Sequence, residues 1–166
     1  MKLKIALDCD DTLFDWRNSH EQKYNCVLKN ISEDAIRAQV MDCKYDKQFW
    51  INLPLLERPD FVPYVYCTKR INPKRYTRLC LLQNKLPIRP IYQIENFYAN
   101  KADYIRYICD VLIDDSYFNV KQCINSGFPA LLITREYNKH INTPYRINHL
   151  NYKEILRKYN ELFREM

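Results

Sequence analysis

Three acidic residues lie within four positions near the start of the sequence: Asp8, Asp10 and Asp11. Asp8 and Asp10 alternate with Cys9, so in an extended chain both carboxylates point the same way. One carboxylate of such a pair can attack a phosphorus atom while the other transfers the proton of the leaving group. Carboxylates this close repel one another, and Mg²⁺ suits a few carboxylates together with a phosphate. The pattern therefore predicts phosphoryl chemistry assisted by a divalent cation.

A short apolar run must position these acids. In a strand, Leu3, Ile5 and Leu7 would lie on one face, and Ala6 is small enough to be buried on the other face. Such a run fits a strand that is buried on both faces of a parallel sheet. In open α/β sheets, ligands bind beyond the carboxyl ends of the strands, where these acids follow. The alternative is an acidic turn in which Asp11 or Thr12 caps the next helix.

Length and composition narrow the class of protein. A chain of 166 residues with 47% hydrophobic residues fits one domain with a sizeable core and a small insertion. The single glycine, Gly127, excludes a glycine-rich phosphate loop. The net charge of +6 favours an anionic partner, but the basic residues are spread along the chain, so nucleic acid is not the expected partner.

The cysteines indicate the compartment. There are seven, without a Cys-x-x-Cys motif, and neither a signal peptide nor an apolar run of membrane length is visible. Reduced thiols in a cytoplasmic protein with no membrane partner are the simplest interpretation.

The rest of the chain alternates predicted helices and strands. A Pro-limited strand near residues 88–94 is expected close to the sheet edge, and residues 129–134 are expected to be the last strand. Leu79, Leu82 and Leu86 have helical spacing and are expected in the core. The alternation predicts an α/β fold, a Rossmann-like parallel sheet flanked by helices. The other expected strands are 61–67 and 110–114, and the expected helices are 14–28, 35–41, 74–86, 101–108, 118–124 and 151–163.

One segment does not fit this alternation. Residues 18–59 lack a strand pattern and are punctuated by Pro54 and Pro59. We expect a small helical cap at 18–59, over a core domain made of 1–17 and 60–166. Such a cap could lie over the strand ends and exclude water, although an ordinary crossover with an extra helix is the alternative.

Further polar residues follow predicted strands or start predicted helices. Thr68 follows the second strand, Lys101 starts a helix, and Asp114 and Asp115 end an apolar run as the first acids do. Each has an ordinary interpretation alone: a helix cap for the threonine or the paired acids, and a solvated surface residue for the lysine.

Taken in order, the acid pair, Thr68, Lys101 and the second acid pair resemble the four motifs of the haloacid dehalogenase-like phosphatases. Three further segments resemble the 5′(3′)-deoxyribonucleotidase family over most of the chain: Phe49-Trp50-x-x-Leu53-Pro54, Asn100-Lys101 and Arg135-Glu136-Tyr137-Asn138. The chain departs from that family at Asp11-Thr12, where Gly-Val is common, and this puts the substrate class in question.

The resemblance implies a role for each matching residue. Asp8 would be the nucleophile, and Asp10 would protonate the leaving group and then activate water. Mg²⁺ would be held by Asp8, the backbone carbonyl of Asp10, and Asp114 or Asp115. Thr68 and Lys101 would bind the phosphate, and Trp16, Phe49 and Trp50 would contact the nucleobase, with a core role as the alternative for both tryptophans.

The expected function is that of a Mg²⁺-dependent phosphatase, specifically a 5′-nucleotidase acting on a small nucleotide. A phosphatase for another small phosphate ester or a nucleic-acid end is one alternative, and a non-catalytic phosphate-binding protein is another. The oligomeric state is left open, a homodimer included.

Overall fold

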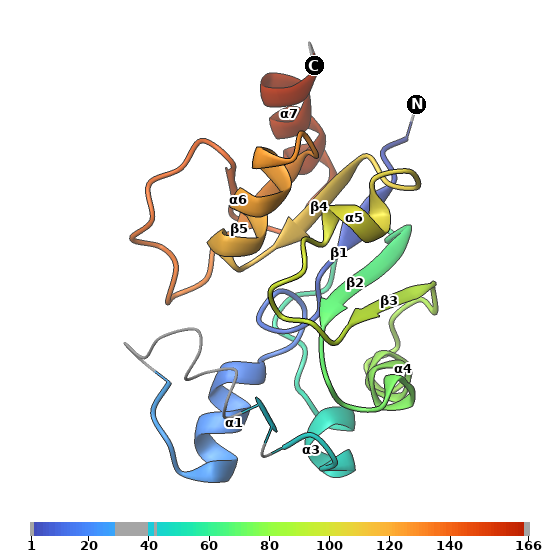
Figure 1. The fold of residues 1–166 in the computed structure, drawn as a ribbon, viewed down its shortest axis with the longest axis vertical. Helices are drawn as coiled ribbons and strands as arrows, with labels where there is room; N and C mark the ends of the chain where they lie inside the picture. Colours follow the sequence, from blue (N-terminus) through green and yellow to red (C-terminus); the bar gives the residue numbers. More distant parts are fainter. Residues whose placement is uncertain (1, 29–39, 42, 165–166) are drawn as a thin grey trace.

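The computed structural model describes residues 2–28, 40–41 and 43–164. Within these ranges it contains one six-stranded sheet in the order β3-β2-β1-β4-β5-β6, with every neighbouring pair parallel (Figure 1). The predicted Rossmann-like α/β fold is therefore confirmed. The strands are β1 (Ile5–Leu7), β2 (Val65–Lys69), β3 (Ile91–Ile94), β4 (Val111–Asp114), β5 (Ala130–Ile133) and β6 (Arg146–Ile147).

Strand β1 lies in the middle of the sheet. Leu7 pairs with Tyr66 of β2 on one side and with Ile113 of β4 on the other. The strand order reverses between β1 and β4, and ligands of doubly wound sheets bind at this switch point. Because the strands are parallel and in register, Asp8 and Asp114 leave the sheet side by side.

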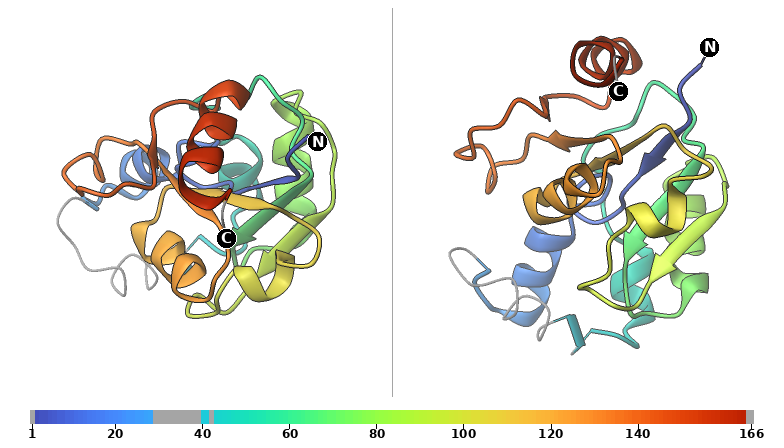
Figure 2. Two further views of the ribbon diagram at one scale, coloured as in Figure 1. Left: turned by 90° about the horizontal axis from the view of Figure 1, so that it is seen from above. Right: turned by 45° about the horizontal axis from the view of Figure 1, so that its top comes forward.

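Helices cover both faces of the sheet. On one face, α4 (Lys74–Gln83) and α7 (Tyr152–Phe163) pack against side chains such as Leu7 and Ile113. On the other face, α5 (Ala102–Ile105) and α6 (Tyr117–Asn125) pack against Ala6 and Leu112. The left view of Figure 2 shows the two pairs on opposite sides. Alternate residues of β1 and β4 thus enter two separate apolar layers, as expected for a sheet buried on both faces.

The predicted insertion contains two described helices, α1 (Trp16–Tyr24) and α3 (Lys47–Ile51). Each has an aspartate as its N-cap: the Asp15 carboxylate accepts from Asn18 N, and the Asp46 carboxylate accepts from Phe49 N. Figure 1 shows both helices at the carboxyl ends of the strands, away from the two chain termini. The predicted helix at 35–41 falls mostly outside the described residues.

Three local predictions need correction. Leu79 and Leu82 are exposed, because α4 turns Tyr76, Thr77, Cys80 and Leu81 toward the sheet instead. The strand at 129–134 is not the last, since β6 pairs beyond it. The N-cap of α1 is Asp15 and neither Asp11 nor Thr12, although Asp11 Oδ1 also accepts from Arg17 N in the first turn at 2.9 Å.

The prediction for β3 is confirmed, since this strand lies at the edge of the sheet. None of the helices in the described part of the chain combines the length and the apolar character needed to cross a membrane.

Candidate active site

A tight turn follows β1 and orients the first acids. Asp8 N donates to Ile113 O at 3.0 Å, and the backbone NH groups of Leu13 and Phe14 both donate to Cys9 O. Asp11 has φ of 54°, in the left-handed region that glycine occupies most easily and that aspartate tolerates. The position at which the deoxyribonucleotidase pattern has glycine is therefore one at which the backbone favours glycine.

Three carboxylates meet at the β1–β4 switch point. Asp8, Asp114 and Asp115 are buried, and each offers an oxygen that lies within 4.8 Å of those of the other two. We call these three residues the carboxylate cluster. Asp8 and the acid pair at the end of β4, more than 100 positions apart in the sequence, are thus brought together by one parallel pairing.

Lys101 closes the carboxylate cluster from the side of α5. Its ammonium group contacts the carboxylate of Asp8 and donates to Asp114 Oδ2 at 2.6 Å. The residue is 1% exposed, which excludes the solvated surface lysine that was the alternative. Burial alone would lower the pKa of Lys101, but the charges of Asp114 and Asp8 outweigh burial and raise it, so the side chain stays protonated.

Asp8 and Asp115 hold their protons more tightly than free carboxyl groups do. Burial raises the pKa of Asp8 to about 6, although Lys101 acts in the opposite direction. Burial, followed by the charges of Asp114 and Asp8, also raises the pKa of Asp115 well above its usual range. A divalent cation would relieve this cost, and three buried carboxylates are a donor set that fits Mg²⁺. The residues present therefore suit the Mg²⁺ that the sequence predicts.

Thr68 provides a hydroxyl group near the cluster. It lies in β2 in register with Gln93 of β3, and it is buried. Among the described residues, none forms a hydrogen bond with its Oγ1 atom. An unsatisfied buried hydroxyl costs about 1–3 kcal/mol, so an anionic oxygen that reaches it would gain a hydrogen bond that the protein itself does not provide.

Asp10 lies apart from the carboxylate cluster and has a different partner. Arg70, just after β2, donates from Nε to Asp10 Oδ2 at 2.8 Å and from Nη2 to Asp10 Oδ1 at 2.5 Å. The Asp10 side chain is 21% exposed, whereas that of Arg70 is 0% exposed. Both carboxylate oxygens of Asp10 are thus engaged by one guanidinium group, and its backbone is left as the part that could reach a metal.

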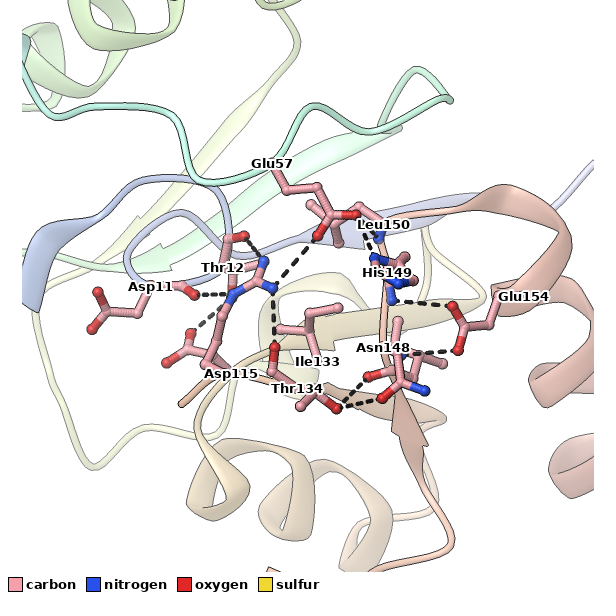
Figure 3. A network of polar contacts seen from close by, with 12 residues as sticks. Asp11, Thr12, Glu57, Asp115, Ile133, Thr134, Asn148, His149, Leu150 and Glu154 are labelled. Atoms are coloured by element: carbon pink, nitrogen blue, oxygen red, sulfur yellow. Dashed lines mark hydrogen bonds and ion pairs between the residues drawn. The ribbon is translucent and has the colours of Figure 1, made fainter. Parts of the chain in front are cut away.

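Arg135, in the loop after β5, fixes the turn that carries the acids. It donates from Nε to Asp11 O at 2.8 Å and from Nη2 to Thr12 O at 2.6 Å. Its Nη1 also lies 3.5 Å from Glu57 Oε2, and Glu57 Oε1 accepts from Leu150 N at 2.7 Å. Figure 3 shows Glu57 between Thr12 and Leu150. The turn after β1 is therefore tied to the segment that leads into α7.

A second set of contacts orients Asp115. Thr12 Oγ1 donates to Asp115 Oδ1 at 2.7 Å, the Tyr137 hydroxyl contacts the same carboxylate, and Asn138 Nδ2 donates to Asp115 O at 2.8 Å. The guanidinium of Arg17 lies 4.2 Å from the centre of the Tyr137 ring. The loop after β5 therefore supports the carboxylate cluster, which gives the segment Arg135–Asn138 a physical role.

The aromatic residues of the insertion form a layer beside the site, which we call the aromatic cluster: Trp16, His20, Tyr24, Phe49 and Trp50. Their rings pack at centre-to-centre distances of 4.6–5.9 Å. Trp50 is 1% exposed and donates from Nε1 to Cys43 O at 2.8 Å, as a core tryptophan does. Trp16 is 4% exposed, but its buried Nε1 has no hydrogen-bond partner among the described residues.

The structure therefore brings together Asp8, Thr68, Lys101, Asp114 and Asp115 at the carboxyl edge of the central strands, with Asp10 beside them. Phe49 and Trp50 lie in the neighbouring insertion, and Trp16 lies just before it, at the start of α1. Sequence reasoning assigned no role to Arg70 or Arg17. The sequence signal that could have pointed to Arg70 is its position two residues after Thr68, close to the end of a predicted strand.

No protein-family model matches the sequence, and no curated protein matches it. Among solved structures, the chain is similar to a HAD-superfamily hydrolase, subfamily IA, variant 1, from Geobacter sulfurreducens. The two share 14% identity with a TM-score of 0.58, over 95% of this chain and 99% of the other. At this identity the similarity establishes the fold, and the narrower resemblance to deoxyribonucleotidases stays a hypothesis. The chain thus has the α/β fold of a haloacid dehalogenase-like hydrolase.

Proposed function

We propose that the protein is a Mg²⁺-dependent phosphomonoester hydrolase that works through an aspartyl-phosphate on Asp8. One observation carries the proposal: Asp8 lies in buried contact with Lys101, beside Asp114 and Asp115, at the switch point of the sheet. Phosphoryl transfer depends on positioning and on neutralising charge. A nucleophile, a fixed cation and carboxylates that suit a metal meet both requirements.

In the first step, an Asp8 oxygen forms a bond to phosphorus while the bond from phosphorus to the ester oxygen breaks. Asp10 gives its proton to the departing oxygen. The Lys101 ammonium group and the Thr68 hydroxyl bind the phosphate oxygens. Asp8, the backbone carbonyl of Asp10, and Asp114 or Asp115 would hold Mg²⁺, which would supply the further positive charge.

In the second step, water replaces Asp8 on phosphorus. Asp10, now a carboxylate, takes a proton from the water as its oxygen bonds to phosphorus, and the bond from Asp8 to phosphorus breaks. Inorganic phosphate leaves, and both aspartates return to their starting states. Burial of the carboxylate cluster keeps other water molecules away from the intermediate.

We propose (deoxy)nucleoside monophosphates as the substrates. The support is the aromatic cluster beside the strand ends, the resemblance of Phe49-Trp50-x-x-Leu53-Pro54 to the deoxyribonucleotidases, and the positive net charge. Stacking on an aromatic side chain is worth about 1–3 kcal/mol per base in nucleic-acid sites, enough to select a nucleotide over a sugar phosphate. Another small phosphate ester or a nucleic-acid end is the alternative substrate.

The test is phosphate release from a panel of nucleoside monophosphates, sugar phosphates and an aryl phosphate, with Mg²⁺ or with excess chelator. We expect release that needs Mg²⁺, returns when Mg²⁺ is added back, and is fastest with nucleotides. Asp8→Asn is the matched control for a contaminating phosphatase. Full activity in chelator would contradict the metal role, and sugar phosphates as the best substrates would contradict the nucleotide assignment.

A further inference from the structure

A buried arginine outside the carboxylate cluster holds Asp10 in an ion pair. Arg70 donates to both of its carboxylate oxygens, at 2.8 and 2.5 Å, with its guanidinium group fully buried. A two-point contact of this kind fixes the plane and direction of a carboxylate, whereas a single contact lets it rotate.

The guanidinium group is itself held by a chain of polar contacts. Its Nη1 donates to Thr77 Oγ1 at 3.1 Å, and Thr77 Oγ1 donates to Gln93 Oε1 at 2.9 Å. Gln93 Nε2 donates in turn to Asn72 O at 2.5 Å. Arg70 is thus anchored to α4, to β3 and to the loop after β2.

The insertion contacts the same guanidinium. The Cζ atom of Arg70 lies 4.9 Å from the Trp50 ring centre and 5.8 Å from that of Phe14. An arginine this deeply buried is costly unless it is paired. Burial would lower the pKa of Arg70, but the nearby charge of Asp10 outweighs burial and raises it. The guanidinium group of Arg70 therefore stays charged, and its two contacts leave a single direction to the carboxyl group of Asp10.

We propose that Arg70 is a positioning residue that acts through Asp10, aiming its carboxyl group at the ester oxygen that leaves. This inference rests on the proposed function, because it gives Asp10 its acid–base role. The alternative is an ion pair that only fastens the loop after β2 to the turn after β1. The positioning role and the purely structural role predict different effects of losing Arg70 on the hydrolysis rate. Only an alkoxide leaving group needs a proton to depart, so loss of positioning should slow alkyl esters more than aryl esters.

The experiment compares kcat for a nucleoside monophosphate and for an aryl phosphate in Arg70→Lys. Lysine keeps the charge but makes a single-point contact. We expect kcat to fall about tenfold or more for the nucleotide and less than about twofold for the aryl phosphate, with little change in KM. In an Asp10→Asn background, Arg70→Lys should cost less than about twofold further, because the residue it acts through is already lost.

Thr77→Val keeps the ion pair and removes only its support, so it carries the test if Arg70→Lys does not fold. We expect kcat for the nucleotide to fall more than kcat for the aryl phosphate, as in Arg70→Lys, but by a smaller factor. Arg58→Lys is the control, because Arg58 also donates twice, to Lys85 O and Asn84 O, but at an exposed position. It should leave both rates unchanged.

Equal losses on the two substrates, or losses that multiply in the double variant, would overturn the role of Arg70 while the phosphatase assignment stands. A wild-type protein that hydrolyses no phosphate ester would instead overturn the proposed function, and the role of Arg70 with it.

Discussion

The carboxylate cluster and the aromatic cluster lie next to each other and are built in opposite ways. Asp8, Asp114 and Asp115 are buried carboxyl groups whose proximity is tolerated because Lys101 lies against two of them. The aromatic cluster is held by ring packing, and the indole NH of Trp16 has no hydrogen-bond partner in the described part of the chain. We propose from this difference that the first region carries out the reaction and the second selects the substrate.

Removing the nucleophile should have the largest effect. In Asp8→Asn the neutral amide cannot attack phosphorus, so we expect no measurable turnover of any phosphate ester. Phosphate release by the purified variant, checked against wild type for folding by circular dichroism, is the measurement. Turnover close to the wild-type rate would mean that the carboxylate cluster does not perform the chemistry.

Asp10→Asn should slow nucleotide hydrolysis by roughly a hundredfold or more, the usual size of lost general acid–base help. The loss should be smaller for an aryl phosphate, whose leaving group needs no proton. Steady-state rates on both substrates test this. If the two losses are equal, Asp10 is not the acid.

The two tryptophans should separate the functions of the aromatic cluster. Trp16→Ala should raise KM for nucleoside monophosphates about fivefold or more, the low end of base stacking, while aryl phosphate hydrolysis stays nearly intact. Trp50→Ala removes a satisfied core residue that contacts Arg70, so it should lower the melting temperature and both rates. A Trp16→Ala variant that behaves like Trp50→Ala would assign Trp16 to the core.

The smallest effect concerns stability. Burial raises the pKa of Asp8 to about 6 and of Asp11 to about 7, so the folded protein binds more protons than the unfolded chain between roughly pH 4 and 7. Stability without metal should therefore fall as the pH rises through this window, by a few degrees in melting temperature, since about 1 kcal/mol is worth roughly 2–4 °C at this size.

Melting curves in chelator at pH 5 and pH 7.5 measure this effect, and Mg²⁺ should restore the loss mainly at pH 7.5, where the carboxylates are ionised. Burial would raise the pKa of Asp46, but hydrogen bonds from Lys23 and from Phe49 N outweigh burial and lower it, so this residue changes stability with pH in the opposite direction. Its side chain is partly exposed, which makes its contribution to stability small. A melting temperature in chelator that increases between pH 5 and 7.5 would contradict the burial of uncompensated acids.

Much of the sheet was predictable because its strands are short apolar runs that end in polar residues. The meeting of Asp8 with Asp114 or Asp115 was expected only from the resemblance to the haloacid dehalogenase-like phosphatases, because the apolar runs do not say that β4 lies beside β1. The buried face of α4 could not be predicted from the spacing of its leucines. Tyr76, Thr77 and Cys80 lie on the face that packs on the sheet, and Leu79 and Leu82 lie on the exposed face. Strand β6 has only two residues, too few to show a period.

The site residues that directly follow or end a strand could be predicted from the sequence. The pairs of residues from distant loops that contact each other could not. Nothing local in the sequence connects Arg70 with Asp10, sixty positions away, or Arg135 with the carbonyl groups of Asp11 and Thr12. Such pairs depend on which loops the fold brings together, and sequence periodicity carries no information about that.

The central place of β1 has a consequence for the synthesis of this protein. Asp8 is synthesised about a hundred residues before Lys101 and Ile113, the two residues that hold it. The surroundings of Asp8 are therefore completed only after β4 has emerged and inserted beside β1. Strand β2 can pair with one edge of β1 earlier, but the edge that β4 covers stays open until then, and contacts this distant in sequence form slowly. While residues 9–110 are being added, the nascent chain therefore carries Asp8 without the carboxylate cluster around it.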